Sequence, residues 1–404
     1  MFKIIALVLL SLLFLFRLFL NIRSFLARKK PIPEEVKDVY DEERYLKWQA
    51  YSNDKLKASI VFSTISFVVT FVLIILDVYS LVCKGVSISY LSALIVLGIY
   101  VGVGLIIDII SDYVMKIKID GKYGFNKATG KTFVGDCIRK TIITVILYAG
   151  LTCLFIALYQ AMGDYILIVF SAIIFVLLLL IKVLFPFLSK ASNRFASLEE
   201  GPLRDRLIAL LTKYGYEVRD IKVMDASRRT TKSNAYFTGS GKTKTIVLYD
   251  NMLKALSEDE IVAVFAHELA HGLHKDSLKR TPLSFLGIVI LVVLAWLLVK
   301  TPQIFVDFGF SGVNYGFAVV LLIEVVAAVI MTFFNIPLLI VSRRCEYKAD
   351  ELANKEGYGE QLISGLKKLY KDDLGDLNPD PLVVALTYSH PTLYQRIKNI
   401  RKDK

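Results

Sequence analysis

The chain alternates between long apolar stretches and charged connecting segments. A helix of about 20 apolar residues crosses the hydrocarbon layer of a membrane, which is about 30 Å thick. Stretches of this kind lie at residues 2–22, 58–82, 90–111, 141–161, 165–187, 282–300 and 315–341. The pattern therefore predicts a mainly α, multi-pass membrane protein with about seven transmembrane helices.

Lysine and arginine gather on one side of these stretches. The connecting segments 23–57 and 112–140 hold nine and seven of them, and residues 188–281 and 342–404 are also rich in both. The alternate connecting segments hold only Lys84 between them, and they lie at 83–89, 162–164 and 301–314. Basic residues favour the cytoplasmic side of a membrane. We therefore expect the N-terminus outside and the large segments in the cytoplasm, in the endoplasmic reticulum membrane of a eukaryote or the cytoplasmic membrane of a bacterium.

Composition narrows the class of protein further. Of the 404 residues, 55% are hydrophobic, and the formal net charge is +12. The mean hydropathy of +0.55 exceeds that of a typical soluble protein, which excludes a simple cytosolic enzyme. The four cysteines lie far apart, so neither a disulfide scaffold nor a cysteine-rich zinc ribbon is expected. Because topology explains the basic excess and no nucleic-acid-binding module accompanies it, the expected partner is a lipid membrane and not a nucleic acid.

The apolar pattern divides the chain into four parts. Residues 1–187 carry five N-terminal transmembrane helices with cytoplasmic loops, and residues 282–341 carry two more. Residues 188–281 form a water-facing α+β insert, and residues 342–404 form a cytoplasmic tail. Within the insert, the pattern predicts a helix at 202–214, strands at 218–225 and 245–250, and a short extended piece at 234–237.

A helix that begins after Ser257 carries the strongest chemical signal. Ser257 and Glu260 have the spacing of a capping box, and the helix continues to His274. It contains an HExxH pattern, His267-Glu268-Leu269-Ala270-His271. Because an α-helix turns by about 100° per residue, both imidazoles lie on one face and can bind one Zn²⁺. Glu268 can take a proton from the attacking water.

The helix alone does not complete a metal site. His274 lies on nearly the same face, but three histidines on one straight helix would span about 10 Å, so we interpret His274 as a surface or outer residue. After the last apolar stretch, Glu346 and Asp350 are four residues apart and share a helix face. Glu346 as the third ligand and Asp350 as a carboxylate that holds a ligand imidazole would complete the site. An exposed acidic face paired with neighbouring basic residues explains the same spacing equally well.

The fourth histidine, His390, stands directly before Pro391. A histidine that is not a metal ligand can donate a hydrogen bond to the oxyanion that forms on an attacked carbonyl. The alternative is a simple turn residue before proline. The sequence pattern leaves both interpretations open.

Together these motifs resemble the type I CAAX prenyl proteases, which are zinc metalloproteases of the integral membrane. The shared landmarks follow the family's order from about residue 120 to the end, and they lie at 123–127, 223–225, 233–237, 246–250, 267–271, 342–346 with Asp350, and 389–391. The resemblance implies a barrel of seven helices around a large water-filled chamber, with one Zn²⁺ per chain at its cytoplasmic end. By matched position, the ligands would be His267, His271 and Glu346, and Glu268 would be the general base.

The resemblance also implies a substrate-binding surface. Asn234, Ala235 and Tyr236 would belong to an edge strand that holds the substrate backbone by strand addition. His390 would stabilise the oxyanion, and Arg396 would lie near the site as a further substrate-binding residue.

The leading hypothesis is therefore a zinc endopeptidase that removes the last three residues of prenylated CAAX proteins. The substrate would be a peptide or protein, with a prenylated C-terminal tail as the first candidate. A membrane quality-control metalloprotease that cuts misfolded membrane proteins is the alternative within the enzyme class, and its smaller number of spans argues against it. A transporter or chaperone with a structural metal is the non-enzyme alternative, but a structural zinc site would need four protein ligands.

Overall fold

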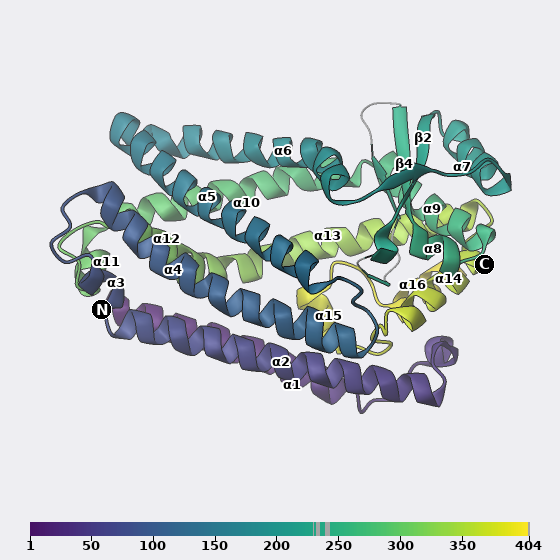
Figure 1. The fold of residues 1–404 in the computed structure, drawn as a ribbon, viewed down its shortest axis with the longest axis horizontal. Helices are drawn as coiled ribbons and strands as arrows, with labels where there is room; N and C mark the ends of the chain where they lie inside the picture. The colour runs from purple at the N-terminus through teal and green to yellow at the C-terminus, as the bar shows by residue number, and fades with distance from the viewer. Residues whose placement is uncertain (229, 232–234, 239–242, 403–404) are drawn as a thin grey trace.

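The computed structural model describes residues 1–228, 230–231, 235–238 and 243–402. Long helices run alongside one another over the length of the molecule, and a small sheet with shorter helices lies at one end (Figure 1). The N-terminus lies at the opposite end from the sheet, whereas the C-terminus lies near it. The molecule thus has a helical body and a compact end, by which we mean the sheet and shorter helices within residues 195–273, 359–372 and 393–402.

Each apolar stretch predicted from the sequence lies on helices of the body. These are α1 (Phe2–Ala27), α2 (Glu42–Ile75), α4 (Ser89–Asp112), α5 (Gly130–Met162), α6 (Ile166–Ser192), α10 (Asp276–Val299), and a last run through α12 (Tyr315–Leu321), η5 (Leu322–Ala327) and α13 (Ala328–Lys355). By length and hydropathy, the described residues hold six stretches able to cross a membrane, and one of these, Gly130–Ile181, contains parts of both α5 and α6. The mainly α membrane architecture is confirmed, whereas seven crossings and an enclosed chamber stay predictions.

The stretch predicted at 58–82 is interrupted near its end. Helix α2 ends at Ile75, and a separate short helix, α3 (Val78–Val82), follows. Between them Asp77 has a φ of 53°, a left-handed conformation that no α-helix can continue through. The Asp77 carboxylate at this break lies 2.8 Å from Lys3 Nζ of α1. The two charges are thus paired, and an unpaired charge in apolar surroundings would be costly.

The helical body buries few of its side chains. In the most apolar window of α2 only 6% of the residues are buried, and in the run Tyr315–Lys355 the share is 33%. Lipid tails are as apolar as these side chains, so burying the side chains between membrane helices contributes little hydrophobic free energy. Short elements join the long helices: η1 (Glu34–Val39), η2 (Tyr113–Asp120), η3 (Gly163–Tyr165) and α11 (Pro302–Asp307).

The compact end contains a four-stranded sheet in the order β1-β2-β4-β3. The strands are β1 (Phe195–Ser197), β2 (Glu217–Met224), β3 (Ala235–Thr238) and β4 (Thr243–Tyr249), with η4 (Ala226–Arg228) after β2 and α7 (Pro202–Lys213) before it. Strands β2 and β4 are parallel, and β3 pairs antiparallel with β4. The predicted helix at 202–214 and the strands at 218–225 and 245–250 are confirmed, and β3 covers the described part of the extended piece.

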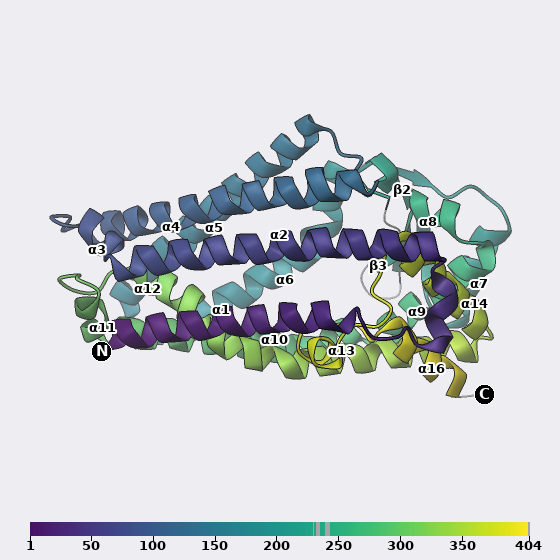
Figure 2. The same ribbon diagram turned by 90° about the horizontal axis from the view of Figure 1, so that it is seen from below.

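Helix α9 (Glu258–Leu273) lies at the centre of the compact end. It begins with the predicted capping box, because the Ser257 side chain accepts from the Glu260 backbone and the Glu260 side chain accepts from the Ser257 backbone. Its apolar side is fully enclosed at positions such as Val262 and Ala266. The helix packs against α7, α13 and α14 (Gly359–Asp372). Helices α8 (Asp250–Ala255) and α16 (Leu393–Lys402) also lie at the compact end (Figure 2), whereas α15 (Pro381–Thr387) packs against α1 and α13 of the body.

Candidate active site

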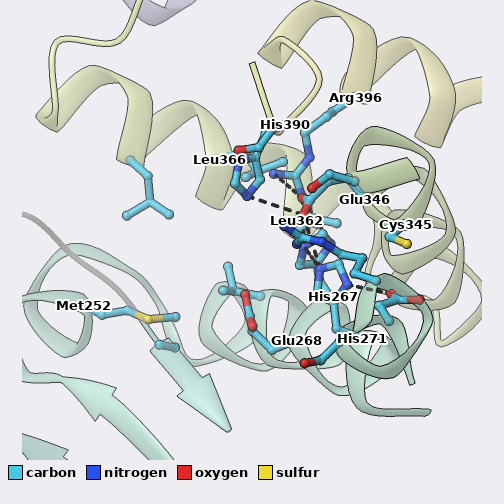
Figure 3. A pocket seen from close by; sticks show the side chains of 18 of the residues that line it. Met252, His267, Glu268, His271, Cys345, Glu346, Leu362, Leu366, His390 and Arg396 are labelled. Carbon is cyan, nitrogen blue, oxygen red and sulfur yellow. Dashed lines mark hydrogen bonds and ion pairs between the residues drawn. The ribbon is translucent and has the colours of Figure 1, made fainter. Parts of the chain in front are cut away.

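Three side chains predicted as metal ligands converge at the compact end. The Nε2 atoms of His267 and His271 lie 3.3 Å apart, and each lies 3.4 Å from an oxygen of the Glu346 carboxylate. Helix α9 supplies both histidines, and α13, which packs against it, supplies Glu346 (Figure 3). His267 and Glu346 are buried and His271 is half-buried, so the cluster lies at the inner wall of the compact end.

A carboxylate orients each imidazole from its far side. His267 Nδ1 lies 2.9 Å from Asp350 Oδ1, and His271 Nδ1 lies 2.9 Å from Asp276 Oδ2. A carboxylate only accepts hydrogen bonds, so each Nδ1 donates and each Nε2 presents a lone pair. Glu346 Oε2 adds a buried oxygen without a hydrogen-bond partner in the described part of the chain. Because lone pairs repel one another at this range, the arrangement fits a metal ion held between them.

The surrounding carboxylates also make the two histidines more basic. Burial alone would lower the pKa of His271, but the adjacent carboxylates of Glu346 and Asp276 outweigh it and raise that pKa to about 9. Burial and Arg396 likewise lower the pKa of His267, whereas the adjacent carboxylates of Asp350 and Glu346 raise it, and the net shift is upward. The field at the cluster is therefore negative and favours a bound cation.

Asp350 joins the metal-binding cluster to α16. Its side chain is fully buried, and its two oxygens accept hydrogen bonds from Arg396 Nη2 at 2.6 Å and Nε at 3.0 Å. Arg396 itself is only 8% exposed. This bidentate pair holds the carboxylate that orients His267, so the geometry favours a positioning role for Arg396, although its side chain also lines the cavity described next.

A cavity of about 710 Å³ opens beside the cluster. Glu268 and His390 both line it, and Figure 3 shows them below and above the ligands in that view. His390 is 63% exposed, and its Nε2 lies 3.4 Å from Glu346 Oε1. Ser389 Oγ lies 2.9 Å from His390 Nδ1. The cavity therefore brings a carboxylate and an accessible imidazole to the same three ligands.

The segment that carries His390 is fixed at both ends of α15. Asp380, the N-cap residue of that helix, lies 2.8 Å from Arg23 Nη2 of α1. After the helix, Arg343 Nη1 of α13 donates to the Tyr388 carbonyl at 2.7 Å. The position of His390 thus depends on two helices of the body that are remote from it in sequence.

The predicted substrate strand is only partly described. Ala235 begins β3 and lines the cavity, and Tyr236 follows it in the same strand. Strand β3 lies at the edge of the sheet, as strand addition requires. Asn234 lies outside the described residues.

Asp276, Arg343 and the Arg23–Asp380 pair support the site, but no sequence motif indicates them. Asp276 follows HExxH by five residues, but a helix break lies between them because Lys275 has a φ of 55°. That left-handed residue starts α10 in a new direction, and no helical periodicity extends across it. His274 lies outside the three-ligand cluster and is partly exposed, in agreement with its interpretation as a surface or outer residue.

An HExxH helix, a remote glutamate and a helical membrane body define the class of integral-membrane metalloproteases. Residues 197–404 match Peptidase family M48, and residues 21–190 match the region described as the CAAX prenyl protease N-terminal, five membrane helices. The chain belongs to peptidase family M48.

Several relatives match over nearly the whole chain. A CAAX prenyl protease 1 homolog of Arabidopsis thaliana is 32% identical and covers 96% of this chain and 95% of its own length. CAAX prenyl protease 1 of Saccharomyces cerevisiae is 27% identical over 95% of this chain and 92% of its own. The crystal structure of S. mikatae Ste24p matches with a TM-score of 0.91 and 25% identity over 99% of both chains. The similarity therefore includes the helical body as well as the compact end.

Proposed function

We propose that this chain is a zinc-dependent endopeptidase that removes the C-terminal tripeptide of prenylated CAAX proteins. The close approach of three side chains carries the zinc assignment. In a tetrahedral site with bonds of about 2.0–2.1 Å, neighbouring donors lie about 3.3–3.4 Å apart. The Nε2 atoms of His267 and His271 lie 3.3 Å apart, and each lies 3.4 Å from one Glu346 oxygen, His267 from Oε2 and His271 from Oε1. Three protein ligands leave one position open, as is typical of catalytic zinc.

Two residues would carry the proton transfers and the charge stabilisation. Bound Zn²⁺ would supply Lewis-acid chemistry at the scissile carbonyl. Glu268 takes the proton of the attacking water and passes it to the leaving amine. The exposed imidazole of His390 lines the cavity, and in the tautomer with a proton on Nε2 it can donate to the oxyanion. Asp350, oriented by Arg396, fixes the ring of His267.

The substrate assignment rests on the relatives and on the architecture. The matching proteins are named CAAX prenyl proteases, and the similarity covers their body helices as well as their metal site. A prenylated tail is held at a membrane by its lipid, so a protease that cuts it benefits from an active site at the end of membrane helices. The edge strand β3, with Asn234, Ala235 and Tyr236, would hold the tail by strand addition. The basic connecting segments support a cytoplasmic active site, with the N-terminus outside.

The test compares a farnesylated CAAX peptide with its unprenylated twin, using purified protein in detergent. We expect cleavage three residues from the end of the farnesylated peptide, about one zinc per chain, inactivation by a chelator and recovery with zinc. The Glu268→Gln variant is the matched control, since it should keep the metal and lose turnover. If neither peptide is cut and an unfolded membrane protein is, the quality-control function replaces this proposal.

A further inference from the structure

A second cavity of about 320 Å³ is lined in part by two helices, α8 and α14, that also line the active-site cavity. On α8, Met252 lines the active-site cavity and Lys254 lines the second one. On α14, Leu369 lines the active-site cavity and Asp372, about one turn later, lines the second one. The two cavities therefore share the walls formed by these helices.

The second cavity is basic, and we call it the basic cavity. Arg44 and Lys47 of α2 line it together with Lys254, and Asp372 is the single carboxylate among its described lining residues. Arg44 donates to the Lys371 carbonyl at 3.0 and 3.1 Å and lies 3.4 Å from Asp372 Oδ1, so this carboxylate already has a cation. Lys47 forms no hydrogen bond or ion pair within the part of the chain that the structure describes.

Lys254 is held only loosely. Its Nζ lies 3.5 Å from Asp250 Oδ2, and the side chain is 71% exposed. The Asp250 carboxylate also accepts from the Ser227 backbone at 2.9 Å, so it is already hydrogen-bonded on another side. Two ammonium groups are therefore available to an anion that enters the basic cavity.

The side of the active-site cavity formed by the helices shared with the basic cavity has an apolar wall. The wall consists of side chains from α8, α9 and α14: Met252, Val264, Leu362, Leu366 and Leu369. Figure 3 shows Met252 and Leu366 on one side of the ligands. A bound molecule that extends from the metal-binding residues along this side meets an aliphatic surface first and positive charge afterwards. A peptide end with aliphatic side chains and a terminal carboxylate matches that order.

The length of the wall also fits a short peptide. Six residues separate Leu366 from Asp372 on α14, a distance of about 9 Å along the helix axis. Three extended residues of a substrate span about 10 Å. A chain whose scissile bond lies at the ligands would thus place its third following residue at the basic cavity.

We propose that the basic cavity binds the C-terminal carboxylate of the peptide substrate, with Lys47 and Lys254 as the binding groups. This contact sets the cleaved bond three residues from the chain end. The inference rests on the proposed function and adds to it a determinant of cleavage position. Through Lys47, α2 of the body would then contribute to substrate selection at the compact end.

The experiment uses the full-length enzyme and two farnesylated peptides that differ only at the C-terminus, a free acid and an amide. For the wild type we expect a KM about tenfold lower for the acid, from charge-assisted hydrogen bonds that the amide cannot form. The double variant Lys47→Gln/Lys254→Gln should raise the KM of the acid to that of the amide and leave the amide's KM and kcat unchanged. Lys131→Gln is the matched control, because it removes an exposed cation that lines neither cavity.

The outcomes separate this inference from the proposed function. A double variant that still prefers the acid, or a wild type that cuts acid and amide alike, would overturn the carboxylate site while the protease assignment stands. If Lys131→Gln raised the KM of the acid peptide equally, the positive charge would act through the membrane surface, and the carboxylate site would also be overturned. A wild type that cuts neither farnesylated peptide would overturn both proposals.

Discussion

The active-site cavity has two halves that are built in different ways. The first, which we call the α9 half, consists of His267, Glu268 and His271, all within five consecutive residues of one helix. The second, the tail half, consists of Glu346, Asp350, His390 and Arg396, which come from α13, α16 and the segment between α15 and α16. The α9 half forms as soon as one helix folds, whereas the tail half forms only when several segments pack together.

The two halves also differ in what holds them. Helix α9 has its own capping box and a fully enclosed apolar face, so local and core interactions fix its side chains. The tail half depends on charged side chains: Arg396 holds Asp350, and Arg343 and Arg23 hold the segment of His390. We therefore expect substitutions in the α9 half to remove chemistry, and substitutions around the tail half to weaken geometry.

The largest effect is expected from Glu268→Gln in the α9 half. Loss of a general base costs about 10²- to 10⁴-fold in kcat, and Gln keeps the size of the side chain. Metal content should stay near that of the wild type, because Glu268 is not among the three converging donors. Single-turnover kinetics and metal analysis check this, and an active Glu268→Gln enzyme would exclude Glu268 as the base.

A pair of matched variants compares Asp350 of the tail half with Asp276 of α10, the carboxylate behind the other ligand imidazole. Asp350→Asn and Asp276→Asn each remove a charge behind one ligand imidazole, and loss of such a partner weakens metal binding by about 10- to 100-fold. We expect the larger loss for Asp350→Asn, because it also leaves the buried Arg396 without its carboxylate. Asp276 instead pairs with Lys279, which is half exposed and can turn to solvent.

Competition with a chelator measures the two metal affinities. Adding Arg396→Gln to Asp350→Asn should restore part of the affinity, since no unpaired buried charge remains. Equal losses of metal affinity in the two single variants would show that the Arg396–Asp350 pair of the tail half orients its imidazole no more strongly than Asp276 of α10 orients the other.

A smaller effect is expected where the tail half is tied to the body. Arg343→Ala removes the donor to the Tyr388 carbonyl, so His390 loses its fixed position, and we expect kcat to fall about tenfold, part of the 10²–10³ that a full oxyanion donor provides. Arg343→Lys should recover part of the rate. In the double variant Arg343→Ala/His390→Ala, the decrease in kcat should equal the decrease caused by His390→Ala alone. An additive loss would mean that Arg343 acts by another route.

The same contrast explains how much of the molecule could be predicted from sequence. The spans and the α9 half follow from periodicity and motif spacing, and both are present as helices where the pattern placed them, except for the break at Asp77. Glu346 and Asp350 share a helix face in the sequence, but only the packing of α13 against α9 distinguishes a metal-binding cluster from an exposed acidic surface. Asp276, Arg343 and Arg23 act through tertiary contacts across helix breaks or over long chain separations, and no local pattern contains them.

The smallest effect concerns the anchoring of α9 itself. Burial would raise the pKa of Glu260, but hydrogen bonds from Lys368, Ser364 and the Ser257 backbone outweigh it, and the pKa lies below its ordinary value. A carboxyl group with a depressed pKa stabilises the fold above its unfolded pKa, and this contribution is lost as pH falls through the folded value. Glu260→Gln keeps the capping geometry and should therefore cost about 1 kcal/mol at pH 7 and progressively less below about pH 5.

Thermal unfolding midpoints in detergent, measured at pH 7 and pH 4, check this difference. Glu258→Gln is the matched control, because Glu258 lies in the same helical turn but is exposed. If Glu260→Gln lowers the midpoint equally at both pH values, the charge does not anchor α9 to α14. The α9 half would then be held by its apolar face alone, which is the strongest form of the contrast with the ion-paired tail half.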